Sequence, residues 1–316
     1  MSERFFIGID LGGTNIAVGV CDQNGNILGR AKKKTHAFRP YQEILDDMAE
    51  CAKLACESAC LDFQAIESIG IGAPGAIDIK GGIIERSENL GFDNVPIVKY
   101  MEEKLGKKVL IENDANAAAW GEYLAGAGKG CNSMVMITLG TGVGGGIIEN
   151  GRILSGAYGM GAEIGHMVIK SGGEPCNCDR RGCFEAYASA TALVRQTKKA
   201  MLENPDSEMW KLVDGNIDLV NGLTAFKATD AVAKKVVENY LFYLSEGVVN
   251  IVNLLQPELI CIGGGISHEG EKIIEPVIKA VKEFSYARNS AKQTKIALAS
   301  LRNDAGIIGA ALLGKL

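Results

Sequence analysis

FFIGIDLGGTNIAVGV, residues 5–20, is the segment from which the architecture of this chain follows. Its first apolar run, ending at Asp10, predicts a strand; Leu11–Thr14 predict a glycine turn, and the second apolar run predicts another strand. Residues 134–148, MVMITLGTGVGGGII, repeat the order of strand, Gly/Thr turn and strand. Two copies of one supersecondary unit predict a duplicated α/β domain.

Both glycine turns have the composition of an anion-binding loop. Glycine lets successive backbone N–H groups approach an anion closely, and Thr14 and Thr141 add hydroxyl donors. Asp10 supplies a carboxylate, the ligand type that a phosphate-bound Mg²⁺ prefers. Neither turn matches the Walker pattern or opens directly into a helix. Each turn taken alone is therefore also compatible with an ordinary glycine hairpin.

A third glycine loop, Gly263–Gly265, follows the strand predicted at Leu259–Ile262 and precedes a helical pattern at residues 269–284. A glycine turn between a buried strand and a helix is a common nucleotide site in α/β sheets. A tight turn without a ligand is the alternative. Because three such loops occur in one chain, we favour phosphate binding.

Residues 111–126, IENDANAAAWGEYLAG, predict the junction between a strand at 108–111 and an alanine-rich helix. Asn113 and Asp114 lie at this junction. Asp114 has two interpretations, a helix cap that accepts the first-turn N–H groups and a carboxylate that takes part in chemistry. The local pattern favours the cap, and the chemical interpretation depends on the phosphate loops elsewhere in the chain.

Residues 163–185, EIGHMVIKSGGEPCNCDRRGCFE, hold one imidazole and three thiols, those of His166, Cys176, Cys178 and Cys183. A Cys3His set is the ligand set of a closed tetrahedral zinc site. Chance clustering in a chain of nine cysteines is the alternative. Glu163 and Glu185 bracket the set. A bound metal would thus fix two carboxylates that can hydrogen-bond a polyhydroxylated ligand.

Composition limits the class of protein. The start, MSERFFIGID, lacks the features of a signal peptide, and no run of 18 apolar residues suggests a membrane span. We therefore expect a cytoplasmic protein, in which clustered cysteines indicate metal rather than disulfides. The net charge of -5 does not favour nucleic-acid binding. The length of 316 residues and the 47% hydrophobic content predict a globular protein of two domains.

Apolar periodicity predicts three further helices, at residues 41–60, 184–203 and 230–255. A strand predicted at Ile69–Ala73 runs into the loop Ala73–Gly75.

Together these motifs resemble those of the ROK family of sugar kinases and repressors, and the resemblance covers essentially the whole chain. The matching segments are DLGGTN at 10–15, GAPG at 72–75, ENDANAAAWGE at 112–122, LGTGVGGG at 139–146, EIGH at 163–166, CNCDRRGCFE at 176–185 and NDAGIIGAA at 303–311. The chain departs from the family at Asp179, where the cysteine stretch usually has glycine. This position is a spacer, so the departure concerns loop detail and not the metal ligands.

The resemblance implies an actin-like ATPase (ribonuclease H-like) duplicated fold, an α/β fold of two domains with a cleft between them. Residues 1–118 would form the small domain, completed by a C-terminal helix at about 301–316. Residues 119–300 would form the large domain with the zinc-binding loop.

The resemblance also implies the ligands and their sites. ATP and Mg²⁺ would lie in the cleft, with the nucleotide against Asp10, Gly12, Gly13, Thr14, Asn15, Thr141, Gly142, Gly264 and Gly265. A hexose would contact Gly75, Asn113, Asp114, Glu163, His166 and Glu185. A structural Zn²⁺ would be bound by His166, Cys176, Cys178 and Cys183. Asp114 would be the general base that accepts the proton of the sugar hydroxyl.

Three functions compete on this basis. The first is an ATP-dependent hexose kinase, and we select glucokinase over a kinase for N-acetylmannosamine or another hexose. The second is a sugar-sensing repressor, which would carry an N-terminal helix-turn-helix; because the hairpin begins by residue 5, we expect none. The third is an assembly or chaperone ATPase, which the cysteine cluster disfavours. ATP and polyphosphate both remain open as donors. We also expect a homo-oligomer, a dimer or a tetramer.

Overall fold

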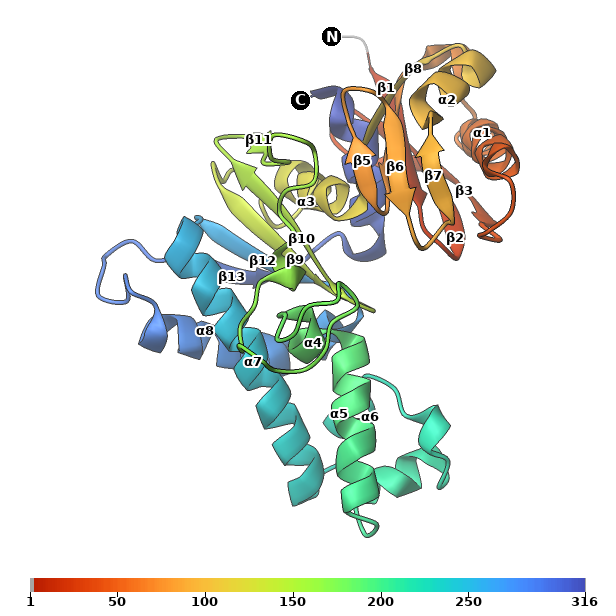
Figure 1. Ribbon diagram of the computed structural model, residues 1–316. Helices are drawn as coiled ribbons and strands as arrows, with labels where there is room; N and C mark the ends of the chain where they lie inside the picture. The colour runs from red at the N-terminus through yellow and green to blue at the C-terminus, as the bar shows by residue number, and fades with distance from the viewer. Residues whose placement is uncertain (1–2, 316) are drawn as a thin grey trace. The chain divides into compact units, whose positions relative to one another are not determined.

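The computed structural model describes residues 3–315, so Met1, Ser2 and Leu316, at the ends of the predicted domain ranges, lie outside the described part. Two five-stranded sheets dominate it (Figure 1). If the strands of each sheet are numbered in chain order, both sheets have the same spatial order, 3-2-1-4-5. This shared order confirms the duplicated α/β fold predicted from the repeated hairpin.

The first sheet has the order β3-β2-β1-β4-β8. Its strands are β1 Phe5–Leu11, β2 Asn15–Asp22, β3 Ile27–Lys34, β4 Ile66–Ala73 and β8 Lys108–Asn113. β2 pairs antiparallel with both β1 and β3, which forms two hairpins. β4 pairs parallel with both β1 and β8. The parallel strands end at the same edge of the sheet, so the residues that follow β4 and β8 come together there.

The second sheet has the order β11-β10-β9-β12-β13. Its strands are β9 Met134–Leu139, β10 Val143–Glu149, β11 Arg152–Ile153, β12 Leu259–Gly263 and β13 Lys295–Leu298. β12 is buried along its whole length, as predicted for this segment, and runs parallel to β13. A small antiparallel sheet lies between β4 and β8 in the chain and contains β5 Ala76–Asp78, β6 Ile83–Ser87 and β7 Phe92–Val95.

Helices that accompany the first sheet are α1 Tyr41–Ser58, α2 Ile97–Leu105, α3 Asp114–Ala125 and α9 Ala305–Ala311. The buried face of α1, including Ile44, Leu45 and Met48, packs into the core formed with the sheet. α9 packs closely against α3 at Gly309, where an added Cβ would lie 1.6 Å from the Ala117 carbonyl oxygen. The C-terminal segment is thus held on the N-terminal half of the chain.

The remaining α-helices are α4 Glu185–Ala188, α5 Ala190–Glu203, α6 Thr224–Lys227, α7 Ala231–Leu255 and α8 Glu271–Phe284. The prediction of one helix at 184–203 was wrong. Ser189 adopts an extended conformation there and accepts the Ala192 N–H group, which ends α4 and caps α5. Short 3₁₀ turns are η1 Phe63–Ala65, η2 Ile164–His166, η3 Glu208–Val213, η4 Ile217–Leu219, η5 Gly265–Glu269, η6 Arg302–Asp304 and η7 Leu312–Lys315.

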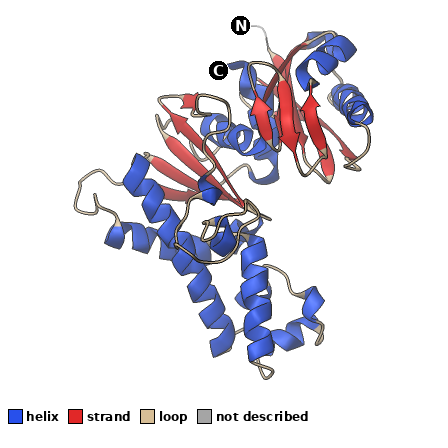
Figure 2. Cartoon of the chain, viewed as in Figure 1, coloured by secondary structure: helices blue, strands red, loops and turns tan. Residues whose placement is uncertain are grey.

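Two compact units divide the chain. The first comprises residues 1–136, 146–162 and 299–316, and the second comprises 137–145 and 163–298. The sequence predicted a small domain of residues 1–118 with 301–316 and a large domain of residues 119–300. Those limits remain a prediction. Between β11 and α4 the chain is almost entirely loop (Figure 2). No helix within residues 3–315 has the length and apolar character needed to cross a membrane.

Candidate active site and metal centre

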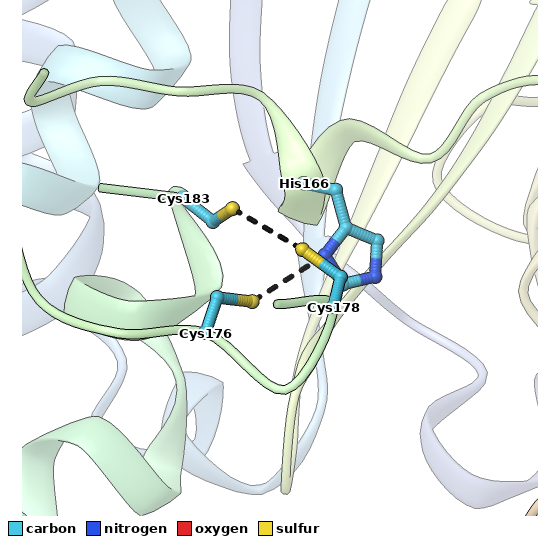
Figure 3. A group of neighbouring side chains, drawn as sticks. All are labelled: His166, Cys176, Cys178 and Cys183. Atoms are coloured by element: carbon cyan, nitrogen blue, oxygen red, sulfur yellow. Dashed lines mark hydrogen bonds between the residues drawn. The ribbon is translucent and has the colours of Figure 1, made fainter. Parts of the chain in front are cut away.

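The predicted Cys3His cluster is assembled in the structure. One nitrogen or sulfur atom from each of its four residues lies within 4.8 Å of the other three. His166 Nδ1 is 3.6 Å from Cys176 Sγ, and Cys178 Sγ is 3.6 Å from Cys183 Sγ (Figure 3). The side chains converge from η2 and from the turn before α4, which confirms the predicted metal-binding group.

These spacings fit a tetrahedral zinc ion. Zn–S bonds of about 2.3 Å and a Zn–N bond of about 2.0–2.1 Å set ligand separations of about 3.8 Å for S···S and about 3.6 Å for S···N. The two observed separations are both 3.6 Å. Burial raises the pKa of the Cys176 thiol to about 12, whereas the Arg180 N–H group lowers the pKa of Cys178. A bound cation would favour the thiolate form of all three cysteines.

A compact turn holds the cysteines. The Cys176 N–H group donates to the Arg180 carbonyl at 2.9 Å, and the Asp179 N–H group donates to the Cys176 carbonyl at 3.1 Å. Asp179, the spacer in the cysteine stretch, has a φ of 64°. The position therefore demands the left-handed conformation, and aspartate tolerates it better than most residues with a side chain.

The two predicted carboxylates flank this cluster. His166 turns its second nitrogen, Nε2, toward Glu163, whose Oε2 is 4.0 Å away. Glu185, the first residue of α4, accepts the Val143 N–H group at 3.0 Å and the Cys176 thiol at 3.7 Å. A side chain at Gly142 would collide with it, because an added Cβ would lie 2.0 Å from Glu185 Oε2. Glu185 thus lies between a predicted metal ligand and the second glycine turn.

Asp114 is the first residue of α3, and Asn113 is its cap. Asn113 Oδ1 accepts the N–H groups of Ala115 at 2.9 Å and of Asn116 at 3.2 Å. The capping role that the sequence allowed for Asp114 therefore belongs to its neighbour. Asp114 is half-buried, and burial raises its pKa against the opposing effect of the Ala115 N–H group. Its carboxylate is thereby made a better proton acceptor.

Asp10 and Asp114 influence each other electrostatically. Burial, followed by the negative charge of Asp114, raises the pKa of Asp10 to about 6. Two carboxylates without a cationic partner are costly to ionise in a partly buried site. The arrangement is suited to a bound cation, which would relieve the repulsion.

A third acid, Glu112, lies two residues before Asp114 and was not identified in the sequence analysis. Glu112 is 3% exposed and accepts hydrogen bonds from the Asn113 N–H group at 2.9 Å, the Asn116 side chain at 3.0 Å and Ser155 Oγ at 3.3 Å. It ties the start of α3 to the loop after β11. The hydrogen bond between Glu112 and Ser155 joins residues far apart in the chain, so no local sequence pattern predicts it.

The first glycine turn closes between β1 and β2, where the Gly12 N–H group donates to the Asn15 carbonyl at 2.9 Å. Gly75 follows β4 with a φ of 113°, and an added Cβ would lie 2.2 Å from the Arg86 carbonyl oxygen. Gly264 follows β12 with a φ of 88°, and an added Cβ would lie 2.5 Å from the Leu139 backbone. Both positions therefore require glycine for conformation and for space.

The predicted site residues fall into two sets. The first unit holds Asp10, Gly12, Gly13, Thr14, Asn15, Gly75, Asn113 and Asp114. The second unit holds Thr141, Gly142, Glu163, His166, Cys176, Cys178, Cys183, Glu185, Gly264 and Gly265. Within each unit the residues gather at the turns that follow strands and at the metal cluster.

The paired sheets and the glycine turns define a duplicated actin-like α/β protein with a Cys3His centre. The chain belongs to the ROK family, whose model matches residues 6–316. It is 37% identical to the glucokinase of Halalkalibacterium halodurans over 318 residues, with all of this chain and 96% of the relative aligned. It is also 37% identical to the glucokinase of Thermotoga maritima over 319 residues, covering all of this chain and 98% of the relative.

The same similarity extends to a solved structure. A ROK family glucokinase from Streptomyces griseus, crystallised in complex with glucose and AMPPNP, superposes with a TM-score of 0.83 at 35% sequence identity. The match covers 98% of each chain.

Proposed function

We propose that this ROK-family sugar kinase is a glucokinase that transfers the γ-phosphate of ATP to the 6-hydroxyl of glucose. The full-length similarity to glucokinases is the observation that carries the proposal. The phosphate-type glycine turns, the paired acids Asp10 and Asp114, and the carboxylates beside the Cys3His cluster supply residue types that each part of this reaction needs.

Asp114 is the proposed general base. A sugar hydroxyl is a weak nucleophile, and a carboxylate that accepts its proton as the P–O bond forms accelerates transfer by about 10²- to 10⁴-fold. Two features of Asp114 suit this task. Burial raises its pKa, and the cap of α3 is Asn113, so Asp114 accepts the Ala115 N–H group through Oδ1 without serving as the cap.

The nucleotide is proposed to bind with its phosphates at Gly12–Asn15, Thr141 and Gly142, and its adenosine at Gly264 and Gly265. Backbone N–H groups of glycine turns bind anions without steric hindrance. When bound, Mg²⁺ would neutralise phosphate charge, and Asp10 would hold it through water. Most of the acceleration would come from positioning and charge neutralisation.

The sugar is proposed to contact Gly75, Asn113, Asp114, Glu163, His166 and Glu185. Carboxylate and amide side chains match the donors of a hexose. His166 donates or accepts through Nε2 while Nδ1 faces the cysteines. Zn²⁺ in the Cys3His site would act structurally, orienting His166 and the turn that ends at Glu185.

One assay decides among the candidate activities. Purified protein is given ATP and Mg²⁺ with a panel of glucose, N-acetylmannosamine, mannose, fructose and allose, and ADP release is coupled to NADH oxidation. We expect the highest kcat/KM for glucose. A more than tenfold preference for another sugar would replace glucose as the substrate, and absence of turnover on every sugar would remove the kinase proposal. Replacing ATP by polyphosphate in the same panel, with sugar phosphate measured directly, identifies the donor.

A sugar-sensing regulator is the alternative, and it predicts glucose binding by calorimetry without turnover. We further propose that the active species is a homodimer or homotetramer, which light scattering on the eluted protein would measure.

A further inference from the structure

Thr35, the residue directly after β3, holds the first glycine turn by two hydrogen bonds. Its hydroxyl donates to the Gly12 carbonyl at 2.5 Å, and its N–H group donates to the Thr14 carbonyl at 3.0 Å. Asn15 and Lys34 form the terminal pair between β2 and β3, so Thr35 lies just beyond the paired residues. The side chain is 0% exposed, and neither glycine motifs nor apolar periodicity point to it.

These bonds fix the orientation of the turn. They occupy the carbonyl groups of Gly12 and Thr14, and within residues 3–315 the N–H groups of Gly13 and Thr14 have no acceptor. On another side the turn is confined by Asn89, because a Cβ added at Gly13 would lie 2.9 Å from the Asn89 carbonyl oxygen. The turn therefore has the Gly12 and Thr14 carbonyls bound to protein, and the N–H groups of Gly13 and Thr14 available for an anion.

Thr35 is itself held by charged neighbours. Arg39 Nε donates to the Thr35 carbonyl at 3.1 Å, and the guanidinium also binds Asp47 of α1. Lys33 binds the same Asp47 at 2.9 Å. The backbone of Thr35 is thus anchored to α1, so the loss of its hydroxyl would leave the residue in place while releasing one side of the turn.

We propose that Thr35 is the positioning residue that holds the Gly12–Thr14 turn in the conformation that receives the nucleotide phosphates. The inference rests on the proposed function, in which this turn binds ATP. Thr35 acts through Gly12 and Thr14 and touches no reacting atom. It links the turn proposed to bind the phosphates, and not the sugar site, to α1 through Arg39 and Asp47.

The test compares three variants. Thr35→Val keeps the shape and removes the hydroxyl, and Thr35→Ser restores the hydroxyl. The matched control is Thr197→Val in α5, since Thr197 is also 0% exposed and its hydroxyl also donates to a backbone carbonyl, that of Leu193, at 2.7 Å. All proteins are measured for kcat, for the KM of ATP and glucose, for Mg–ATP affinity by calorimetry, and for melting temperature.

Thr35→Val is expected to lower kcat/KM for ATP by about tenfold, because small displacements of a positioning group have large effects on transfer. Its KM for glucose should stay within about twofold of the wild-type value. Thr35→Ser should recover most of the loss, and Thr197→Val should change only the melting temperature.

Two results overturn the proposal. In one, Thr35→Val resembles Thr197→Val, with a changed melting temperature and unchanged ATP parameters. In the other, the KM values for ATP and glucose rise equally. If wild-type protein phosphorylates no sugar, the proposed function fails, but Mg–ATP affinity still decides the role of Thr35. Weaker binding by Thr35→Val alone supports it, whereas equal binding, or no binding by wild type, rejects it.

Discussion

Replacing Asp114 by asparagine tests whether Asp114 acts as a base or only as a structural residue, because the substitution changes the shape of the side chain little. The Ala115 N–H group donates to Asp114 Oδ1 at 2.8 Å, and the asparagine oxygen can accept the same bond. The cap of α3 is Asn113, which the substitution leaves untouched. What disappears is the negative charge and the ability to accept a proton.

The expected loss is in turnover. A general base contributes about 10²- to 10⁴-fold, which corresponds to about 3–5 kcal/mol of transition-state stabilisation. Glucose KM should change less than kcat, because the lost interaction belongs mainly to the transition state. Stability should not fall. Burial opposes ionisation of Asp114, and its charge raises the pKa of Asp10, so a neutral side chain removes two unfavourable effects.

Asp230→Asn is the matched control. Asp230 caps α7, accepting the Ala233 N–H group at 2.7 Å and the Ser207 hydroxyl at 2.7 Å. The same substitution there should leave kcat unchanged but lower the melting temperature, because Asp230 also accepts the Glu208 N–H group at 2.6 Å and the amide nitrogen of asparagine cannot replace an accepting oxygen. The pair of variants therefore distinguishes loss of a charge at any helix start from loss of the proposed base.

The measurements are steady-state kinetics with glucose and Mg–ATP, and thermal unfolding without ligands. An Asp114→Asn variant that keeps more than a tenth of wild-type kcat would refute the base assignment. Glu163 and Glu185 would then be the next candidates for that role.

Two further predictions concern the other charged site and the metal. The pKa of Asp10 is raised from 3.8 to about 6, so the unfolded chain ionises first, and stability falls as pH rises from about 4 to about 6. Asp10→Asn should therefore raise the unfolding free energy of protein free of nucleotide and Mg²⁺ at pH 7 by up to roughly 3 kcal/mol, and with it the melting temperature. Below pH 4 the substitution should have no such effect, so an equal effect at both pH values contradicts the prediction. Elemental analysis should find one zinc per wild-type chain and per Cys60→Ser control, whose thiol is exposed and outside the cluster, but none in Cys178→Ser. Equal zinc in all three proteins would remove the assignment.

Much of the fold follows from local pattern. Alternation of apolar residues and glycine turns predicted the hairpin in both halves. α7, which runs from Ala231 to Leu255 and is capped by Asp230, matches the helix predicted at 230–255 from its periodicity. The failure at 184–203 also has a local cause. The sequence around Ser189 allows this residue to lie inside a helix. Its extended backbone, with a ψ of 164°, shows that it caps α5 instead.

The assignment of the α3 cap shows the same limit. Asn113 and Asp114 are both good capping residues, and the choice between them depends on which one leaves the strand with an extended backbone. That residue is Asn113, with φ −61° and ψ 145°. The position of the strand end is set by pairing of β8 with β4, which a single stretch of sequence does not contain.

By itself the sequence determined the metal ligands, because His166, Cys176, Cys178 and Cys183 are close in the chain and their spacing alone limits how they can meet. It also indicated the glycine turns, because glycine adopts a positive φ, such as 113° at Gly75 or 88° at Gly264, without the steric cost of a Cβ. Only the tertiary structure decided that Thr35 holds Gly12 and that Glu112 holds Ser155. These contacts join residues distant in the chain. Their formation depends on strand order and register, which are selected by burial over the whole sheet and not by any neighbouring residues.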